Sequence, residues 1–228
     1  MRTLPGDLAE AVARRLVAAG AAEDPERAYL YAQEARRLAA RVGIVRETTG
    51  IAAYRAGHWA DALAELRAAR RLTGRTSYLP LMADSERALG RPDRALAIIN
   101  DPGASQLDRA TEIELRIVES GVRRDQGLPD AAVVALQVPE LSDGRIRPWS
   151  ARLFYAYADA LLDAGRDGDA RGWFGQAAAA DSAGETDAAE RCEVIDEVMI
   201  DDLMGGADDD AGDDAGDDGP GDDRLGEH

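Results

Sequence analysis

The sequence predicts an all-α protein built from repeated helical hairpins, on three observations. Alanine, arginine and glutamate are abundant and runs of β-branched residues are few, which is a composition typical of helices. Small and apolar residues recur at helical spacing along most of the chain. A glycine followed five residues later by an alanine occurs four times at similar intervals. With 228 residues, the chain is long enough to bury a sizeable core.

The clearest hairpin lies in residues 46–72. Its first helix places small residues around Tyr54, and its second helix begins at Trp59 after a break at Gly57. The small positions of the two helices are Gly50, Ala53, Ala62 and Ala69. Small residues let two helices approach closely, and we expect Tyr54, Trp59 and Leu66 to fill the space between them.

Four glycine–alanine pairs give the repeat its register. They are Gly57 and Ala62, Gly90 and Ala95, Gly127 and Ala132, and Gly165 and Ala170. Successive glycines are 33, 37 and 38 residues apart, which indicates one repeat with insertions in its loops. Pro92 and Pro129 follow their glycines by two residues, where proline can begin a second helix without losing a hydrogen bond.

The segments outside these pairs complete the predicted domain. Residues 7–19 read as a helix that Gly20 ends, and Asp24 with Pro25 forms the start of the next helix. We interpret these two helices as a diverged first hairpin with a longer turn. Residues 139–148 are expected to be a loop inserted within one domain, because an isolated repeat cannot bury its apolar face alone.

The C-terminal part of the sequence predicts two further features. Residues 185–203 form a helix without a partner helix after it, and we expect this helix to cap the open end of the stack. From residue 205 onward the chain has ten acidic residues, one arginine and almost nothing apolar, which predicts a disordered acidic tail. The predicted domains are therefore 1–204 and 205–228. The tail is interpreted as solubilising, or alternatively as a segment that binds a basic partner or the chain's own arginines.

The order of residues in 46–72, small-x2-Ala-Tyr-x2-Gly-x-aromatic-x2-Ala-x3-Leu-x2-Ala, resembles a tetratricopeptide (TPR) repeat. Over residues 7–203 the chain is similar to uncharacterised TPR proteins of high-GC bacteria. The resemblance implies a TPR-like right-handed helical-hairpin solenoid with a C-terminal capping helix and a disordered acidic tail. It also implies a concave face, lined by the first helix of each hairpin, that binds a protein or peptide.

The resemblance places partner contacts near the ends of these first helices. In the glycine register, the candidate partner-binding residues are Tyr54, Arg55, Arg87, Arg123, Arg124 and Arg152. Guanidinium groups pair bidentately with carboxylates, so such a face would suit an acidic peptide. Alternatively, these arginines are solvated and paired with nearby glutamates. TPRs that grip a chaperone's terminal carboxylates use lysine and asparagine; this chain has no lysine and one asparagine, Asn100, which disfavours that role.

The residue types for common catalytic chemistry are sparse. All 27 basic residues are arginine, so a phosphate-binding lysine or a lysine nucleophile is excluded. The two histidines, His58 and His228, cannot form a triad or a metal cluster with neighbouring ligands. Cys192 is expected to be a small core residue. We therefore predict no enzyme activity, no metal and no cofactor.

Charge and hydropathy exclude further classes of function and location. The net charge of −17 argues against a duplex-binding surface. No apolar run approaches a membrane span, the start of the chain is a poor signal peptide, and the single Cys192 cannot form an internal disulfide, so a cytoplasmic protein is expected. The predicted function is a scaffold or adaptor that binds a partner in the concave groove. The alternatives are a self-associating structural subunit and, less favoured, a protein associated with single-stranded nucleic acid.

Overall fold

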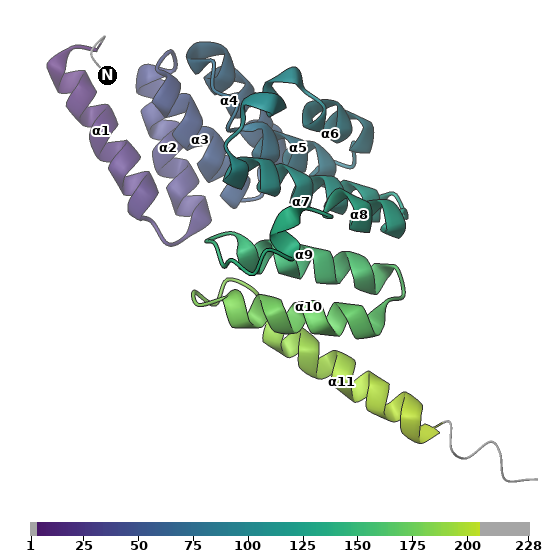
Figure 1. Ribbon diagram of the computed structural model, residues 1–228. Coiled ribbons are helices and arrows are strands. Elements are labelled where there is room, and N and C mark those ends of the chain that lie inside the picture. Colours follow the sequence, from purple (N-terminus) through teal and green to yellow (C-terminus); the bar gives the residue numbers. More distant parts are fainter. Residues whose placement is uncertain (1–3, 206–228) are drawn as a thin grey trace, which may run out of the picture.

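The computed structural model describes residues 4–205, and all regular secondary structure in that range is helical (Figure 1). The all-α fold class predicted from the sequence is therefore confirmed for this range. The acidic tail predicted for 205–228 lies, apart from Gly205, outside the described residues. Between residues 4 and 205, no helix is both long enough and apolar enough to cross a lipid bilayer.

The helices pair in sequence order. The α-helices are α1 (Gly6–Ala21), α2 (Pro25–Ala39), α3 (Gly43–Arg55), α4 (Trp59–Thr73), α5 (Leu79–Ala88), α6 (Pro92–Ile99), α7 (Arg109–Asp125), α8 (Pro129–Ala135), α9 (Ser150–Asp163), α10 (Asp167–Ala180) and α11 (Ala188–Gly205). Each odd-numbered helix from α1 to α9 packs against the even-numbered helix after it, and α11 packs against α10 (Figure 1). The odd-numbered helices of successive pairs also touch one another from α1 to α9.

Four of the five hairpins turn in the same way. The turn glycines Gly57, Gly90, Gly127 and Gly165 have φ between 70° and 75°, a region that strains L side chains. The amide of the residue after each glycine donates a hydrogen bond of 2.9–3.0 Å to the carbonyl five residues earlier, as His58 does to Ala53. This is the Schellman arrangement at a helix C-terminus. The four glycines of the repeat register therefore lie at the turns between the paired helices.

Close approach of the paired helices explains the small residues. A methyl group added at Gly50 of α3 would lie 2.7 Å from Cγ of Leu66 on α4, so only glycine fits there without a shift. Ala62 and Leu66 are fully buried. Tyr54 and Trp59 meet edge to face with ring centroids 5.2 Å apart, and both rings are partly exposed.

The first hairpin differs from the sequence prediction. Gly20 does not end α1, which continues to Ala21. The connection to α2 is therefore short rather than long. The carboxylate of Asp24 accepts a hydrogen bond of 3.1 Å from the amide of Glu26, and Pro25 begins α2 directly after this cap. Gly20 does not have the left-handed φ of Gly57 and its counterparts, so it is not the C-terminal turn residue that the sequence prediction took it for.

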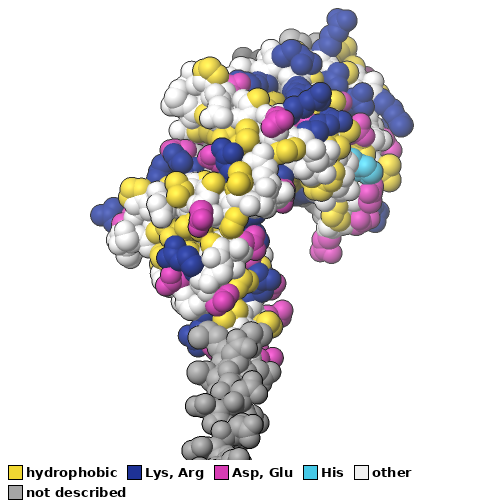
Figure 2. All heavy atoms as spheres, turned by 90° about the vertical axis from the view of Figure 1, so that its right-hand side faces the viewer, with side chains coloured by type: hydrophobic (Ala, Val, Ile, Leu, Met, Phe, Trp, Pro, Cys, Tyr) yellow, Lys and Arg dark blue, Asp and Glu magenta, His cyan; other side chains and the backbone are white. Residues whose placement is uncertain are grey.

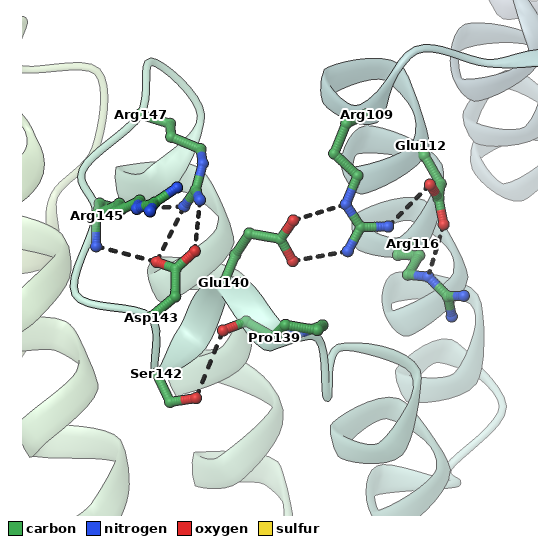
Figure 3. Close-up of polar contacts among 9 residues, drawn as sticks. All are labelled: Arg109, Glu112, Arg116, Pro139, Glu140, Ser142, Asp143, Arg145 and Arg147. Atoms are coloured by element: carbon green, nitrogen blue, oxygen red, sulfur yellow. Dashed lines mark hydrogen bonds and ion pairs between the residues drawn. The ribbon is translucent and has the colours of Figure 1, made fainter.

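Residues 139–148 are irregular apart from the 3-10 helix η2 (Pro139–Leu141), as predicted. Ion pairs fasten this loop to the preceding hairpin and to itself (Figure 3). Glu140 accepts two hydrogen bonds from Arg109 of α7, at 2.7 and 2.6 Å. Asp143 pairs with Arg147, whose guanidinium lowers the pKa of that carboxyl to about 2.

Because the paired helices lie close together, a larger side chain should lower stability at a buried position but not at an exposed one. Ala62→Leu should lower the free energy of unfolding by about 1–3 kcal/mol, because this buried site between α3 and α4 has no room for a larger side chain. Ala64→Leu, two residues along on the exposed face of α4, is the matched control and should change it by less than about 0.5 kcal/mol. Urea titration measures both. Equal effects at the two positions would contradict the observed packing.

Candidate functional site

One groove crosses the first helices of successive hairpins. Its volume is about 450 Å³, and its walls come from α3, α5, α7, α9 and the loop before α11. Ile117, Val118 and Ala156 give it an apolar section, while tyrosines, arginines and carboxylates supply the rest. Residues as distant in sequence as Tyr54 and Thr186 therefore border the same space.

Four of the six candidate residues named from the sequence line this groove. They are Tyr54, Arg87, Arg124 and Arg152. Arg55 is exposed at the end of α3 and is not part of the groove wall. Arg123 faces a separate hollow, which Arg116 and Asp130 also line. Neighbouring residues on a helix point about 100° apart, so the residue next to a groove-lining one, such as Arg55 beside Tyr54 or Arg123 beside Arg124, can face a different surface.

Two groove arginines connect successive hairpins. Arg87 of α5 donates to Asp84 on its own helix at 2.8 Å and to Asp125 at the end of α7 at 3.0 Å. Arg124 of α7 reaches α9, where it donates to Asp159 at 3.0 Å and to Asp163 at 2.6 Å. These arginines therefore act as links between neighbouring helices of the groove.

The third groove arginine is paired as well. Arg152 of α9 lies 2.7 Å from the carboxylate of Glu114 on α7. Arg191 of α11 adds a 2.6 Å hydrogen bond to Asp159, next to the Arg124 contact. The groove arginines therefore have acidic partners, but these are mostly aspartates on a neighbouring helix rather than the nearby glutamates of the sequence-based alternative. A ligand carboxylate that enters here has to compete with these pairs.

The groove tyrosines are protonated hydrogen-bond donors at neutral pH. The Tyr54 hydroxyl donates to Asp84, and burial together with this carboxylate raises the pKa of Tyr54 well above its ordinary value. Burial, followed by the neighbouring Asp187, raises the pKa of Tyr155 to about 12. Neither phenol is therefore poised to act as a base.

Two further groove groups are relevant to binding. Ser120 is 1% exposed and borders the groove, and its Oγ has no hydrogen-bond partner within the described residues. Burial raises the pKa of Glu114; Arg152 opposes this shift, and the like charge of Glu185 adds to it. A ligand that hydrogen-bonds to the buried Ser120 hydroxyl, or that places a positive charge beside Glu114, would therefore stabilise these groups.

The sequence analysis did not assign the acidic residues of the groove, although two of them occur at a fixed spacing before a turn glycine. Asp84 and Asp159 both stand six residues before a turn glycine, Gly90 and Gly165 respectively. Gly121 occupies the same register in α7, where a methyl group would lie only 3.4 Å from Nε of Arg87. A small residue at this position leaves room for the arginine to cross α7.

The described histidine and cysteine, His58 and Cys192, lie outside the groove and contact neighbouring side chains. His58 stacks against Tyr29 with centroids 4.7 Å apart and lies 3.0 Å from Glu26. Burial raises the pKa of the Cys192 thiol, which reduces its reactivity at neutral pH. In the part of the chain that the structure describes, no three His, Cys, Asp or Glu side chains are grouped to hold a metal ion.

Neither models of known protein families nor a search of curated proteins gave a match to this chain. The groove geometry is therefore the basis for a functional conclusion.

The environment of Glu114 predicts two opposite shifts. Glu185→Gln should lower the pKa of Glu114, because it removes a like charge, and Arg152→Ala should raise it, because it removes the paired cation. Since the folded-state pKa is raised, ionisation of Glu114 lowers stability as the pH rises from the unfolded-state pKa through the folded-state value. Carboxyl NMR titration tests both variants. A pKa that moves in neither would show that these charges do not act on Glu114.

Proposed function

We propose that this chain is a non-catalytic, TPR-like scaffold that holds an extended segment of a partner protein in the groove. In this proposal the stacked hairpins form a solenoid, and α11 covers its last hairpin. The observation that carries the proposal is the convergence of four successive first helices on one groove. A peptide is elongated, so a groove that crosses several helices offers it contacts along its length.

The groove chemistry also supports a peptide. Its apolar section can receive one or two side chains of a ligand, while Ser120 and the tyrosines offer fixed polar groups. Binding sites typically combine apolar walls with a few such polar groups. The groove has neither the large apolar area of a permanent subunit interface nor a row of unpaired cations for a nucleic-acid backbone.

We also propose that the partner segment brings a basic group. Four carboxylates line the groove, those of Asp84, Glu114, Asp159 and Glu185, against three arginines that are already paired. Burial, and after it the like charge of Glu185, raises the pKa of Glu114, and a ligand cation beside these two residues would favour the ionised form of Glu114. The acidic peptide predicted from the sequence would instead have to displace existing pairs, and it stays an alternative for the test to decide.

Photo-cross-linking tests the groove directly. A benzophenone amino acid at Ala156, inside the groove, should capture a partner segment in the native cell, and mass spectrometry should identify a peptide with apolar and basic residues. The same amino acid at Ala64, on the exposed face of α4, is the matched control. Arg87 and Arg124 are poor probes because they also link helices.

The outcome separates the alternatives. The proposal predicts a defined cross-link from Ala156 that is absent from Ala64. Cross-links of an acidic segment would support the sequence-based expectation instead. Identical products from both positions, or none from Ala156, would contradict a groove-binding function.

A further inference from the structure

Charge is unevenly distributed along the chain. Residues 4–75 contain 12 arginines and 9 acidic residues, whereas residues 76–205 contain 13 arginines and 25 acidic residues. Residues 206–228 add ten acidic residues and one arginine. The N-terminal hairpins are therefore net basic, and the rest of the chain is strongly acidic. Opposite charges at two ends of one molecule favour contacts between copies.

The basic character concentrates where α2 and α4 end. Arg37, Arg41 and Arg71 are exposed there, and none has a carboxylate partner among the side chains described for residues 4–197. We call these three residues the arginine patch. The turn between α2 and α3 lies against the end of α4, because a methyl group at Gly43 would be 2.5 Å from Cγ2 of Thr73. The patch therefore draws on adjacent segments.

The surface view agrees with this placement. Figure 2 shows arginines crowded at the top of the molecule with few carboxylates between them, at the height where Figure 1 places the C-terminal ends of α2 and α4. Ile44 and Leu72, 44% and 50% exposed, add apolar surface beside the turn. Arginines in the last turn of a helix interact favourably with the helix dipole, and this accounts for part of their presence here. Most other described arginines pair with a carboxylate as well, whereas the patch arginines do not. The patch arginines remain available for one.

We propose that residues 206–228 of one copy bind the arginine patch of a second copy. The sequence supplies the charge complementarity: ten acidic residues against one arginine in the segment, and cations without acidic partners in the patch. The groove is a weaker destination for this segment, because Arg87, Arg124 and Arg152 already have carboxylate partners. The lining of the groove does not include the patch, so assembly leaves the groove open.

Reach favours a second copy over the same chain. The described chain ends with α11, which points away from the hairpins at the end opposite α1 and α2 (Figure 1). The three intervening hairpins, at about 10 Å each, and the 18 residues of α11 put the patch roughly 50 Å from Gly205. A random coil of 23 residues, the length of 206–228, would span about 25–30 Å on average. The patch of another copy faces no such limit.

The proposed contact joins different surfaces of the two copies, so it continues from copy to copy unless a ring closes. Assembly should therefore grow with concentration and weaken as salt screens the charges. All the packed cores described here lie within residues 4–195, so the contact adds to a fold that is already complete.

Sedimentation velocity of the full chain tests the proposal. At low ionic strength, the average mass should rise with concentration, and about 0.5 M salt should return the chain to the monomer. The triple variant Arg37→Ala, Arg41→Ala, Arg71→Ala should assemble more weakly, with an apparent dissociation constant about tenfold higher than that of the parent chain. The control triple variant Arg55→Ala, Arg94→Ala, Arg145→Ala removes three arginines outside the patch and should assemble almost as the parent chain does.

A synthetic peptide of residues 206–228 provides the second arm. Added in excess, it should disperse the assembly, whereas the same peptide with asparagine in place of aspartate should not. A chain that stays monomeric at every concentration would overturn the proposal. So would an assembly that the patch variant leaves unchanged, or one that both triple variants weaken equally. Cross-linking at Ala156 is independent of these outcomes, so failure here leaves the groove function untouched.

Discussion

Ion pairs between arginines and carboxylates of different helices are the interaction on which the arrangement of this protein depends. Glu86 of α5 is fully buried, and its carboxylate is 2.7 Å from Arg67 of α4. Glu65, 5% exposed, receives Arg36 of α2 and Arg46 of α3 in the same way. A buried carboxylate without such partners would strongly destabilise the fold. Apolar packing runs both within and between hairpins, because each core cluster includes residues of at least two hairpins. Pairs such as Arg36 with Glu65 and Arg67 with Glu86 add polar links between neighbouring hairpins.

The same pairs determine which groups are available for binding. In the groove, arginines are occupied by aspartates and glutamates of neighbouring helices, and the available groups are a buried hydroxyl, apolar side chains and an excess of acid. At the ends of α2 and α4 the balance is reversed, because arginines outnumber carboxylates. The two surfaces therefore suit ligands of different charge, and one chain can use both at once.

The sequence predicted the hairpins well because their turns depend on local chemistry. Only glycine adopts the left-handed turn conformation without strain, so Gly57 and its counterparts mark each turn. Gly20 was misread as such a turn residue, because its φ is not left-handed and α1 continues through it to Ala21. Contacts across helices were harder to predict: Arg55 and Arg123 were assigned to the groove by proximity in sequence, and Asp159 was missed because its partner lies 35 residues away.

Groove arginines connect successive hairpins, and a double-mutant cycle on Arg124 and Asp159 tests this connection most directly. The two side chains are 28% and 15% exposed and meet at 3.0 Å, so neither is fully screened by water. With each residue changed to alanine singly and together, urea unfolding should give a coupling energy of about 1 kcal/mol. Additive effects, with coupling below about 0.3 kcal/mol, would contradict the claim and leave Arg124 as ordinary helix surface.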